Sequence, residues 1–259
     1  MYSNGEAYER FMGRWSRPLA LLLLEFADIP DGGRVLDLGA GAGSLAFTIA
    51  EKRPHCSITG IDDSPEYVAH VKRRNLMGDR VRFEVGDAQQ MRFDDATFQS
   101  TLSLLVFNFI PDPEKALCEA ARVTQPGGRI AAAVWEYGAG MEMLRVFWDA
   151  AASIDPRVES LDEKHMPLCR AGELAQLWTK VGLTNVAEKP LDITMRFQNF
   201  ADYWEPFLLG QGPAGAYARQ LEQPQLKQVR EEVKRRLQLS QENTAFELSG
   251  RAWGVRGTV

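Results

Sequence analysis

Three short segments near the start of the chain combine glycine, aspartate and apolar residues at almost even spacing. They are Val35-Leu36-Asp37-Leu38-Gly39-Ala40-Gly41-Ala42-Gly43, Gly60-Ile61-Asp62-Asp63 and Gly86-Asp87-Ala88. Glycines allow a tight turn and let the backbone approach a ligand without obstruction by a Cβ atom. A carboxylate such as that of Asp62 can accept hydrogen bonds from both hydroxyls of a ribose. One such as that of Asp87 can accept from the exocyclic amine of an adenine, so the pattern indicates a site for an adenosine-containing ligand.

These segments fall where strands are expected to end. Short apolar strands are predicted at 34–38, 57–61, 80–85, 100–107 and 129–135. A helix is predicted to open at Ser64-Pro65-Glu66, because a capping residue stands before a proline at the first helical position. The alternation of strands and helices predicts parallel strands joined by right-handed crossovers, which is an α/β, doubly wound sheet. In such a sheet, ligands bind at the carboxyl ends of the strands.

The rest of the chain extends this sheet and adds helices. Two further strands are predicted at 183–196 and 244–256, which gives a mostly parallel sheet of seven strands, and Pro190 favours an edge position. The other predicted helices cover 6–27, 113–123, 171–181 and 200–239. Pro18 is expected to break the first of them in two, with Ser16 capping the second part.

No repeat and no linker rich in proline, glycine or serine divides the chain. We therefore expect a single domain over 1–259, with N-terminal helices in 1–30. Residues 137–170 look irregular, like an insertion after the fifth strand. Together with 197–240 they are expected to bind the acceptor molecule or to form a lid over it.

The glycine turn also fits a second class of enzyme. The segment Gly41-Ala42-Gly43-Ser44-Leu45-Ala46 satisfies the G-x-G-x-x-A pattern of dinucleotide-binding folds. An NAD-dependent oxidoreductase is therefore the alternative enzyme. Such an enzyme would need neither Asp37 in the first segment nor Asp87 after the third strand, so the three segments together favour another adenosine cofactor.

The stretch 34–136 resembles the class I S-adenosylmethionine-dependent methyltransferases, near the small-molecule group that includes the ubiquinone- and menaquinone-biosynthesis methyltransferases. Segments similar to the family's motifs are 37–43 for the first motif, 60–64 for ribose, and 86–88 with 93–98 for adenine. Further similar segments are 8–15, 110–113 and 122–128. One departure is Gln99, where the family usually has an acidic residue, and we interpret that position as structural.

The resemblance implies which residues contact the cofactor. They are Arg14, Asp37, Gly39, Ala40, Gly41, Gly43, Asp62, Asp63, Asp87, Ala88, Ser103 and Leu104. The glycine loop would line the methionine and ribose portions, with Asp37 orienting the loop and the ammonium group. Asp62 would hold the ribose diol, and Asp63 would lie beside the adenine. Asp87 and the backbone of Ala88 would read the adenine edge.

At the other end of the cofactor, Ser103 and Leu104 would face the methionine, and Arg14 would meet its carboxylate. The resemblance implies S-adenosylmethionine as cofactor and S-adenosylhomocysteine as product. The sulfonium already activates the methyl group, so transfer is an in-line displacement for which orientation supplies much of the rate. A base is needed only where the acceptor must lose a proton, and we leave the catalytic side chain unassigned.

Few residues are candidates for such a base. They are His165, Glu136, Tyr137 and Asn108, all in or just before loops where acceptor-binding parts gather. A surface or strand-end role would account for each of them as well. His55 is expected at the opposite end of the sheet, and His70 within a helix.

We expect the acceptor to be a small organic molecule in a largely apolar pocket under a helical lid. The rings considered for this pocket are Phe11, Trp15, Trp135, Phe147, Trp148, Tyr203 and Trp204. Aromatic rings at helical spacing also form ordinary core. A non-catalytic S-adenosylmethionine-binding protein is the alternative of a different class. The acceptor, the attacked atom and the oligomeric state do not follow from the sequence.

Composition limits the partners and the compartment. The net charge of −5 and the pI of about 5.4 argue against a nucleic-acid substrate. The sequence contains neither an HExxH motif nor a Cys/His cluster, so we expect no metal. The three cysteines form no CxxC pair and the chain has no secretion-signal pattern, which favours the cytoplasm. The apolar run 19–24 is too short for membrane insertion.

Overall fold

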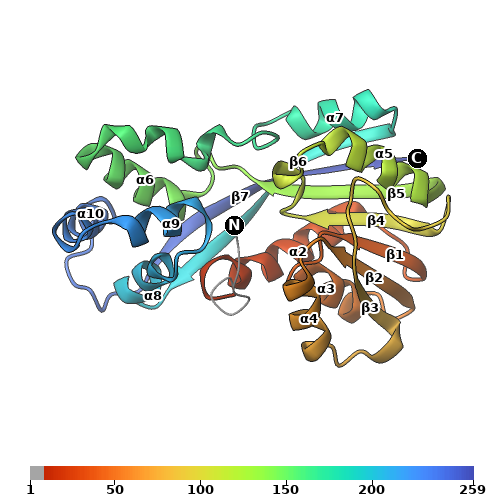
Figure 1. Cartoon of the computed structure of the whole chain (residues 1–259), viewed down its shortest axis with the longest axis horizontal. Coiled ribbons are helices and arrows are strands. Elements are labelled where there is room, and N and C mark those ends of the chain that lie inside the picture. Colours follow the sequence, from red (N-terminus) through yellow and green to blue (C-terminus); the bar gives the residue numbers. More distant parts are fainter. Residues whose placement is uncertain (1–8) are drawn as a thin grey trace. The chain divides into compact units, whose positions relative to one another are not determined.

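The computed structural model describes residues 9–259 (Figure 1). Strands in this part of the chain are β1 (Gly33–Leu38), β2 (Cys56–Asp62), β3 (Val81–Val85), β4 (Phe98–Leu104), β5 (Thr124–Trp135), β6 (Thr184–Phe197) and β7 (Phe246–Thr258). Its α-helices are α2 (Arg14–Ala27), α3 (Ser44–Lys52), α4 (Pro65–Arg74), α5 (Pro113–Val123), α6 (Glu142–Ile154), α7 (Glu173–Val181), α8 (Phe200–Trp204), α9 (Gly212–Gln220) and α10 (Gln223–Arg236). The shorter helical turns are Glu9–Gly13 (π-helical) and Gly78–Arg80, Phe107–Phe109, Pro156–Leu161, Glu163–His165 and Glu205–Leu209 (3-10).

The seven strands form one sheet in the order β3-β2-β1-β4-β5-β7-β6. β1 lies between β2 and β4 and is parallel to both, so that Asp37 is level with Gly60 and Leu102. β3 and β5 continue the parallel arrangement, and β7 is antiparallel to β5. Right-handed crossovers place α3 and α4 on one face and α5 on the other (Figure 1). The doubly wound, mostly parallel seven-stranded sheet is confirmed.

The local signals that start α4 and α5 act as expected. The Ser64 hydroxyl accepts a hydrogen bond from the backbone of Tyr67 at 3.2 Å, and Asp112 accepts one from Lys115 at 2.9 Å. In both helices a proline occupies the first turn. Pro190 lies in β6, the last strand in the order, as its missing backbone donor requires.

Three local predictions are wrong. Pro18 does not break the N-terminal helix, because Arg14–Ala27 is continuous and Ser16 lies inside it. Pro18 lacks the N–H that would donate to the carbonyl of Arg14, and the α-helix continues past it after the π-helical turn Glu9–Gly13. Residues 137–170 contain the regular helix α6. β4 stops at Leu104 because Leu105 takes a left-handed backbone with φ of +64°. The part of the predicted helix at residues 6–8 lies outside the described residues.

The chain divides into two compact units. The larger unit comprises residues 15–135, 167–191 and 252–259, and it holds β1 to β5 with α3, α4, α5 and α7. The smaller unit includes 136–166 and 192–251 with the described residues 9–14. It contains α6 and α8 to α10. The acceptor-binding or lid role of 137–170 and 197–240 stays a prediction.

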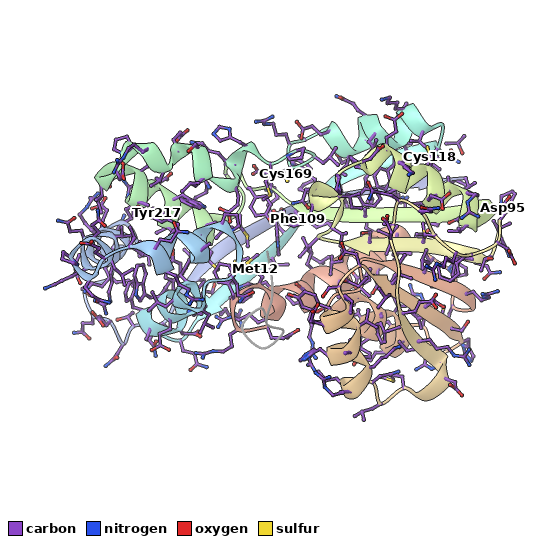
Figure 2. The ribbon with its side chains drawn as sticks, in the orientation of Figure 1. Met12, Asp95, Phe109, Cys118, Cys169 and Tyr217 are labelled. Atoms are coloured by element: carbon purple, nitrogen blue, oxygen red, sulfur yellow. The ribbon has the colours of Figure 1, made fainter. Side chains whose placement is uncertain are left out.

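The smaller unit has an aromatic core. The ring of Phe147 stacks on that of Phe207, with 4.5 Å between centroids and 8° between planes. Phe11 meets Phe207 edge to face at 5.1 Å, and Trp148 lies 5.6 Å from Tyr217, whose place among these helices is marked in Figure 2. The rings expected to line an acceptor pocket are all buried in one core or the other: Phe11, Phe147, Trp148, Tyr203 and Trp204 here, and Trp15 and Trp135 in the larger unit. In the smaller unit these rings pack against one another, as the pair of Phe147 and Trp204 also shows, with 6.3 Å between centroids.

Two features of residues 9–259 bear on membranes and metals. None of the helices there combines the length and the apolar character that crossing a bilayer requires. Nor do the described residues gather three or more His, Cys, Asp or Glu side chains that could hold a metal ion. The expectations about membrane insertion and metals stay predictions for the whole chain.

Candidate cofactor site

A cavity of about 130 Å³ lies at the carboxyl ends of the parallel strands in the larger unit. Its walls come from the ends of β1, β2 and β3 and from the segment after β4. The lining residues are Gly39, Ile61, Asp62, Asp63, Gly86, Asp87, Ala88, Gln89, Val106, Phe109, Ile110 and Pro111. Gly39, Asp62, Asp63, Asp87 and Ala88 among them were predicted from the sequence. The sheet therefore brings the ends of three separate strands to one cavity.

The glycine loop after β1 takes backbone angles that other residues avoid. Gly39 has φ of +76°, and a Cβ atom there would collide with the side chain of Val106. Gly41 has φ of +50°, yet a Cβ atom there would meet nothing within 4 Å. Gly39 is thus required by packing, whereas Gly41 presents bare backbone toward open space, where a ligand could approach it closely.

Asp62 connects the end of β2 to this loop. Its Oδ2 atom accepts a hydrogen bond from the backbone of Gly41 at 2.8 Å, and its Oδ1 atom accepts one from Ser64 at 3.0 Å. Burial raises the pKa of Asp62, the hydrogen bonds from Ser64 and Gly41 oppose this, and the nearby charge of Asp63 adds to the rise. Each carboxylate oxygen accepts more than one hydrogen bond, so Asp62 retains acceptor capacity toward the cavity.

Asp37 lies deeper, with a side chain that is completely buried. Its Oδ2 atom accepts a hydrogen bond from the backbone of Ala46 at 2.9 Å, but its Oδ1 atom is buried without a partner. Burial raises the pKa of Asp37 to about 7 against the effect of the Ala46 hydrogen bond, and the charge of Asp62 raises it further. A buried acceptor without a partner is rare in proteins. A cationic group of a ligand would supply the missing interaction.

At the other end of the cavity, Asp87 is held by its neighbour Gln89. The Oδ1 atom of Asp87 accepts hydrogen bonds from the backbone of Gln89 at 2.8 Å and from its Nε2 atom at 3.2 Å. The Oε1 atom of Gln89 accepts a hydrogen bond from the backbone of Asp112 at 3.0 Å. Gln89 therefore couples the segment after β3 to the start of α5. Asp87 also lines the cavity, where its carboxylate suits a hydrogen-bond donor such as an amine.

The segment after β4 supplies a wall that sequence reasoning missed. Val106, Phe109, Ile110 and Pro111 line the cavity. The left-handed backbone of Leu105, with φ of +64°, turns the chain sharply after the strand. Residues 110–113 did carry part of the family resemblance, but apolar side chains in a loop gave no signal for a binding role.

Several predicted cofactor residues do not line this cavity. Gly43 begins α3, and Ala40 donates its backbone N–H to the Ile61 carbonyl at 2.8 Å. Ser103 donates its hydroxyl to the Leu38 carbonyl at 2.8 Å and so links β4 to β1. Asp37, Gly41 and the buried Leu104 also do not line the cavity.

Arg14 belongs to the smaller unit and has partners there. Its guanidinium binds both carboxylate oxygens of Asp202, at 2.6 and 3.1 Å, and donates to the Arg196 carbonyl at 3.2 Å. It also lies 5.0 Å from the centroid of the Phe197 ring. The predicted contact with the methionine carboxylate stays a prediction.

The candidate bases are dispersed. His55 forms a hydrogen bond with Asp31 at 2.8 Å, and His70 lies on α4. His165 is exposed beside Glu159, with 3.6 Å between its Nε2 atom and the Oε1 atom of Glu159. Asn108 and Tyr137 are buried.

Glu136 lines a separate cavity of about 490 Å³ in the smaller unit. It shares that cavity with Glu142, Asp192 and Arg251. The structure thus singles out no general base, and the catalytic side chain stays unassigned.

Gln99, the departure from the family pattern, has a structural role. Its Oε1 atom accepts a hydrogen bond from the backbone of Arg34 at the start of β1. Its Nε2 atom donates to the side chain of Gln125 in β5 at 3.2 Å. The amide therefore joins three strands at the end of the sheet opposite the cavity.

Part of this chain matches a known protein family. Residues 36–132 match the family described as Methyltransferase domain. A demethylmenaquinone methyltransferase of Thermus thermophilus is 37% identical over 118 residues, which make up 45% of this chain and 52% of that protein. The chain spans about half the length of the curated relatives it matches.

Solved structures share the fold. A methyltransferase described as putative, from an antibiotic biosynthesis pathway of Anabaena variabilis, superposes with a TM-score of 0.65 at 15% identity over 93% of this chain and 96% of that one. The phosphoethanolamine N-methyltransferase 2 of Haemonchus contortus, solved in complex with S-adenosyl-L-methionine, gives 0.60 at 19% identity over 98% of this chain and 56% of that one. At these identities the likeness establishes the fold and nothing finer.

Proposed function

Because the chain belongs to the class I S-adenosylmethionine-dependent methyltransferases, we propose that it transfers a methyl group from S-adenosylmethionine to a small organic acceptor. The observation that carries this proposal is the cavity where Gly39, Asp62 and Asp87 meet. The carboxylates of Asp62, Asp63 and Asp87 line this cavity, and the buried Asp37 lies on β1 before the glycine loop. Together they suit a ligand that carries a ribose, an adenine and a cation. This arrangement is what supports the cofactor assignment over NAD.

The residues present fit this cofactor. Asp62 would accept hydrogen bonds from the ribose hydroxyls, and Asp63 and Asp87 would lie at the adenine. The unpartnered oxygen of Asp37 suits the ammonium group of the methionine portion. The apolar side chains of Val106 and Phe109 would exclude water from one face. When bound, S-adenosylmethionine supplies a methyl group that its sulfonium has already activated.

The contribution of the protein is then binding and orientation. Buried carboxylates hold the ligand in one position because their own positions are fixed by backbone hydrogen bonds from Gly41, Ser64 and Ala46. Holding two reactants in line makes methyl transfer effectively unimolecular and lowers its barrier without a covalent intermediate. A base would be needed only for acceptors that must lose a proton.

The acceptor is proposed as a small molecule by similarity. The Thermus thermophilus relative is named for demethylmenaquinone and the Haemonchus contortus structure for phosphoethanolamine, which are both small acceptors. We propose that residues 137–170 and 197–240 contribute to acceptor binding. The cytoplasm is the proposed compartment, because Cys56, Cys118 and Cys169 are all free thiols.

Calorimetric titration of the purified chain with S-adenosylmethionine, S-adenosylhomocysteine and NAD tests the cofactor. We expect both sulfur compounds to bind and NAD not to bind. Asp62→Asn should weaken binding of both, while Asp28→Asn, which makes the same charge change on an exposed residue outside the cavity, should leave it unchanged. Binding of NAD alone would contradict the proposed methyl transfer and favour an NAD-dependent oxidoreductase that transfers hydride. Cofactor binding without methylation of any acceptor would favour the non-catalytic alternative.

A further inference from the structure

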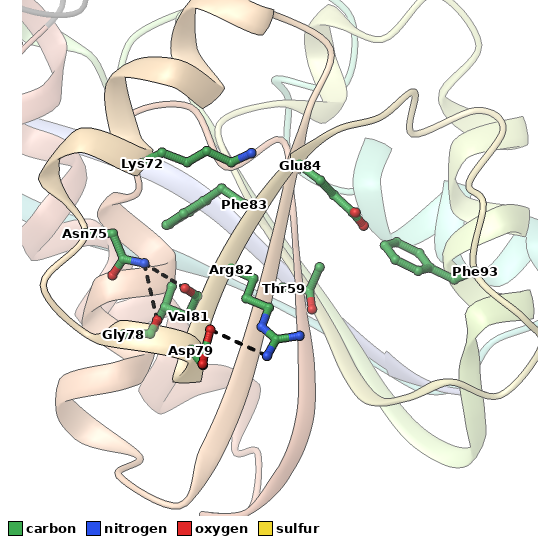
Figure 3. A pocket seen from close by; sticks show the side chains of 10 residues that line it. All are labelled: Thr59, Lys72, Asn75, Gly78, Asp79, Val81, Arg82, Phe83, Glu84 and Phe93. Atoms are coloured by element: carbon green, nitrogen blue, oxygen red, sulfur yellow. Dashed lines mark hydrogen bonds and ion pairs between the residues drawn. The ribbon is translucent and has the colours of Figure 1, made fainter.

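One edge of the sheet in the larger unit carries an open groove. β3 is the terminal strand of the sheet, and within residues 9–259 it has a neighbouring strand, β2, on one side only. A groove of about 570 Å³ lies at this edge and is lined by Val81, Arg82, Phe83 and Glu84 of β3, with Asn75 on one side of the strand and Phe93 on the other (Figure 3). The strand edge is a row of backbone groups that can pair with another strand.

The register with β2 identifies which backbone groups face outward. Gly86 donates its N–H to the Asp62 carbonyl at 3.0 Å, so Gly86 faces β2. The backbone N–H and C=O groups of successive residues point to opposite sides of a strand. Glu84 and Arg82 therefore also direct theirs to β2, while Val85 and Phe83 direct theirs away from β2, to the open side of the sheet.

Val81 also faces outward, but its backbone groups are already engaged. Its carbonyl accepts a hydrogen bond from the Nδ2 atom of Asn75 at 2.7 Å, and its N–H donates to the Gly78 carbonyl. The free part of the edge is therefore centred on Phe83 and Val85.

The charges of this strand are complementary to those of a second, antiparallel copy of it. It reads Val81-Arg82-Phe83-Glu84-Val85. If a second copy pairs antiparallel with Phe83 opposite Phe83, Arg82 of each copy faces Glu84 of the other, and Val81 faces Val85. The two Phe83 residues then exchange two backbone hydrogen bonds. Arg82 and Glu84 are exposed and lie on the same face of the strand, so the two opposite-charge pairs form without burial of a lone charge.

The other outward-facing register is less favourable. Pairing Phe83 with Val85 of the second copy would use more of the free backbone groups. It would also place Glu84 directly opposite Glu84 and leave Arg82 opposite Gly86. Like charges directly opposite each other destabilise a strand pair. Charge therefore selects the register that is centred on Phe83.

Two exposed apolar side chains lie at the ends of this edge. Val85 is 53% exposed, and Leu76, in the turn before β3, is 93% exposed. The hydrogen bond from Asn75 to Val81 holds the Leu76 turn at the start of the strand. In the register centred on Phe83, the start of one strand lies beside the end of the other. The Leu76 turn of each copy then lies toward Val85 of its partner.

We propose that two copies of this chain associate through antiparallel pairing of their β3 edges, centred on Phe83, so that two seven-stranded sheets become one. The partner is a second copy rather than another protein because one strand carries both Arg82 and Glu84. Each copy therefore supplies the opposite charge that the other copy needs. The interface is isologous, which is the usual arrangement of homodimers.

Charge exchange in the full-length chain tests the pairing. Arg82→Glu places Glu opposite Glu84 twice, and Glu84→Arg places Arg opposite Arg82 twice. By sedimentation velocity, we expect each single variant to raise the dimer dissociation constant by about tenfold or more. The double variant Arg82→Glu/Glu84→Arg restores the pairs and should return the constant toward that of the wild type. Arg17→Glu and Glu51→Arg, the same reversals on exposed residues of α2 and α3, should have no effect.

Two further results bear on the proposal. Hydrogen exchange of the Phe83 and Val85 amides should slow as protein concentration rises, and this slowing should be absent in Arg82→Glu. Unchanged far-ultraviolet circular dichroism and melting temperature would show that the variants fold. A wild type that is monomeric throughout the micromolar range would overturn the proposal. So would a dimer that is indifferent to both single reversals, since it would use another surface.

Discussion

The Oδ2 atom of Asp62 lies 2.8 Å from the backbone nitrogen of Gly41, so one carboxylate joins the end of β2 to the glycine loop after β1. The same side chain also accepts the Ser64 N–H through its other oxygen, at 3.0 Å. A residue proposed to bind the ribose thus also fixes the loop that would bind the rest of the ligand. Its loss should have two separate consequences.

Asp62→Ala and Asp62→Asn should separate these consequences. Alanine leaves the amides of Gly41 and Ser64 without acceptors, which costs on the order of 1–3 kcal/mol of unfolding free energy. Asparagine keeps one carbonyl oxygen and should lose less stability. Both variants lose the paired acceptor for the ribose, so both should weaken S-adenosylmethionine binding by about tenfold or more. Urea denaturation and calorimetry measure the two effects.

Asp28→Asn is the matched control and should change neither quantity. A stable Asp62→Asn variant that binds S-adenosylmethionine as tightly as the wild type would contradict the proposed ribose contact. It would leave Asp62 with a purely structural role at the end of β2.

Asp37 should make stability depend on pH. Burial, opposed by the Ala46 hydrogen bond, raises its folded pKa to about 7, well above the unfolded value of 3.8. Between these values the folded state binds more protons than the unfolded state, so the stability contributed by this group falls as pH rises from about 4 to about 7. Asp37→Asn should remove that fall. Between pH 4 and pH 8, the melting temperature of the variant relative to that of the wild type should therefore rise with pH. Parallel curves for the two proteins would contradict the raised pKa.

The same proton should be linked to cofactor binding. A ligand ammonium group beside the buried Oδ1 atom of Asp37 requires the ionised carboxylate, so binding below pH 7 should release a proton. Calorimetry in two buffers with different ionisation enthalpies measures that release. S-adenosylhomocysteine carries the same ammonium group and should show it too, and Asp37→Asn should abolish it. An equal proton count in wild type and variant would exclude Asp37 as its source.

The sequence predicts those parts of the fold and site that depend on local pattern. Strand ends followed by glycine or aspartate put Gly39, Asp62 and Asp87 at one edge of a parallel sheet, and the structure confirms that they line one cavity. The start of α5 follows from Asp112 and Pro113, because capping needs only neighbouring residues.

The parts of the fold and site that could not be predicted depend on contacts between residues far apart in the sequence. Val106 and Phe109 line the cavity because the chain turns sharply at Leu105. No local sequence pattern predicts that turn. The partner of Arg14, Asp202, is far away in the chain. The aromatic acceptor pocket stays a prediction for a related reason. Helical spacing of rings such as Phe147 indicates that a face is buried, but not whether it faces a ligand or other rings.

Gly39 and Gly41 should respond differently to alanine. A Cβ atom at Gly39 would collide with Val106, while one at Gly41 would meet open space. Gly41→Ala should cost only the left-handed backbone strain of about 1–2 kcal/mol and still fold. It should nevertheless weaken S-adenosylmethionine binding, because the methyl group occupies the space proposed for the ligand. Thermal melts and calorimetry test both expectations.

Gly39→Ala should destabilise the chain more than Gly41→Ala does. Adding Val106→Ala relieves the collision and should recover part of that loss. If Gly41→Ala binds S-adenosylmethionine with unchanged affinity, then the ligand does not approach the backbone at Gly41.

The ion pair of Arg14 with Asp202 sets a limit on what Arg14 can contribute to cofactor binding. Burial raises the pKa of Asp202, but the hydrogen bonds from Arg14 and from the Gln198 backbone outweigh it, and the pKa is lowered overall. Both side chains are 28% exposed, so solvent screens the pair and its contribution to stability should be about 1 kcal/mol or less.

Because the guanidinium already has its bidentate partner, Arg14→Met and Asp202→Asn should have small and similar effects on S-adenosylmethionine affinity. Combining them in a double-mutant cycle should yield a coupling in stability but none in affinity. The family resemblance makes the opposite prediction, a contact between Arg14 and the methionine carboxylate. That contact would appear as a loss of about tenfold in affinity for Arg14→Met alone, with Asp202→Asn binding at least as tightly as the wild type because it frees the guanidinium.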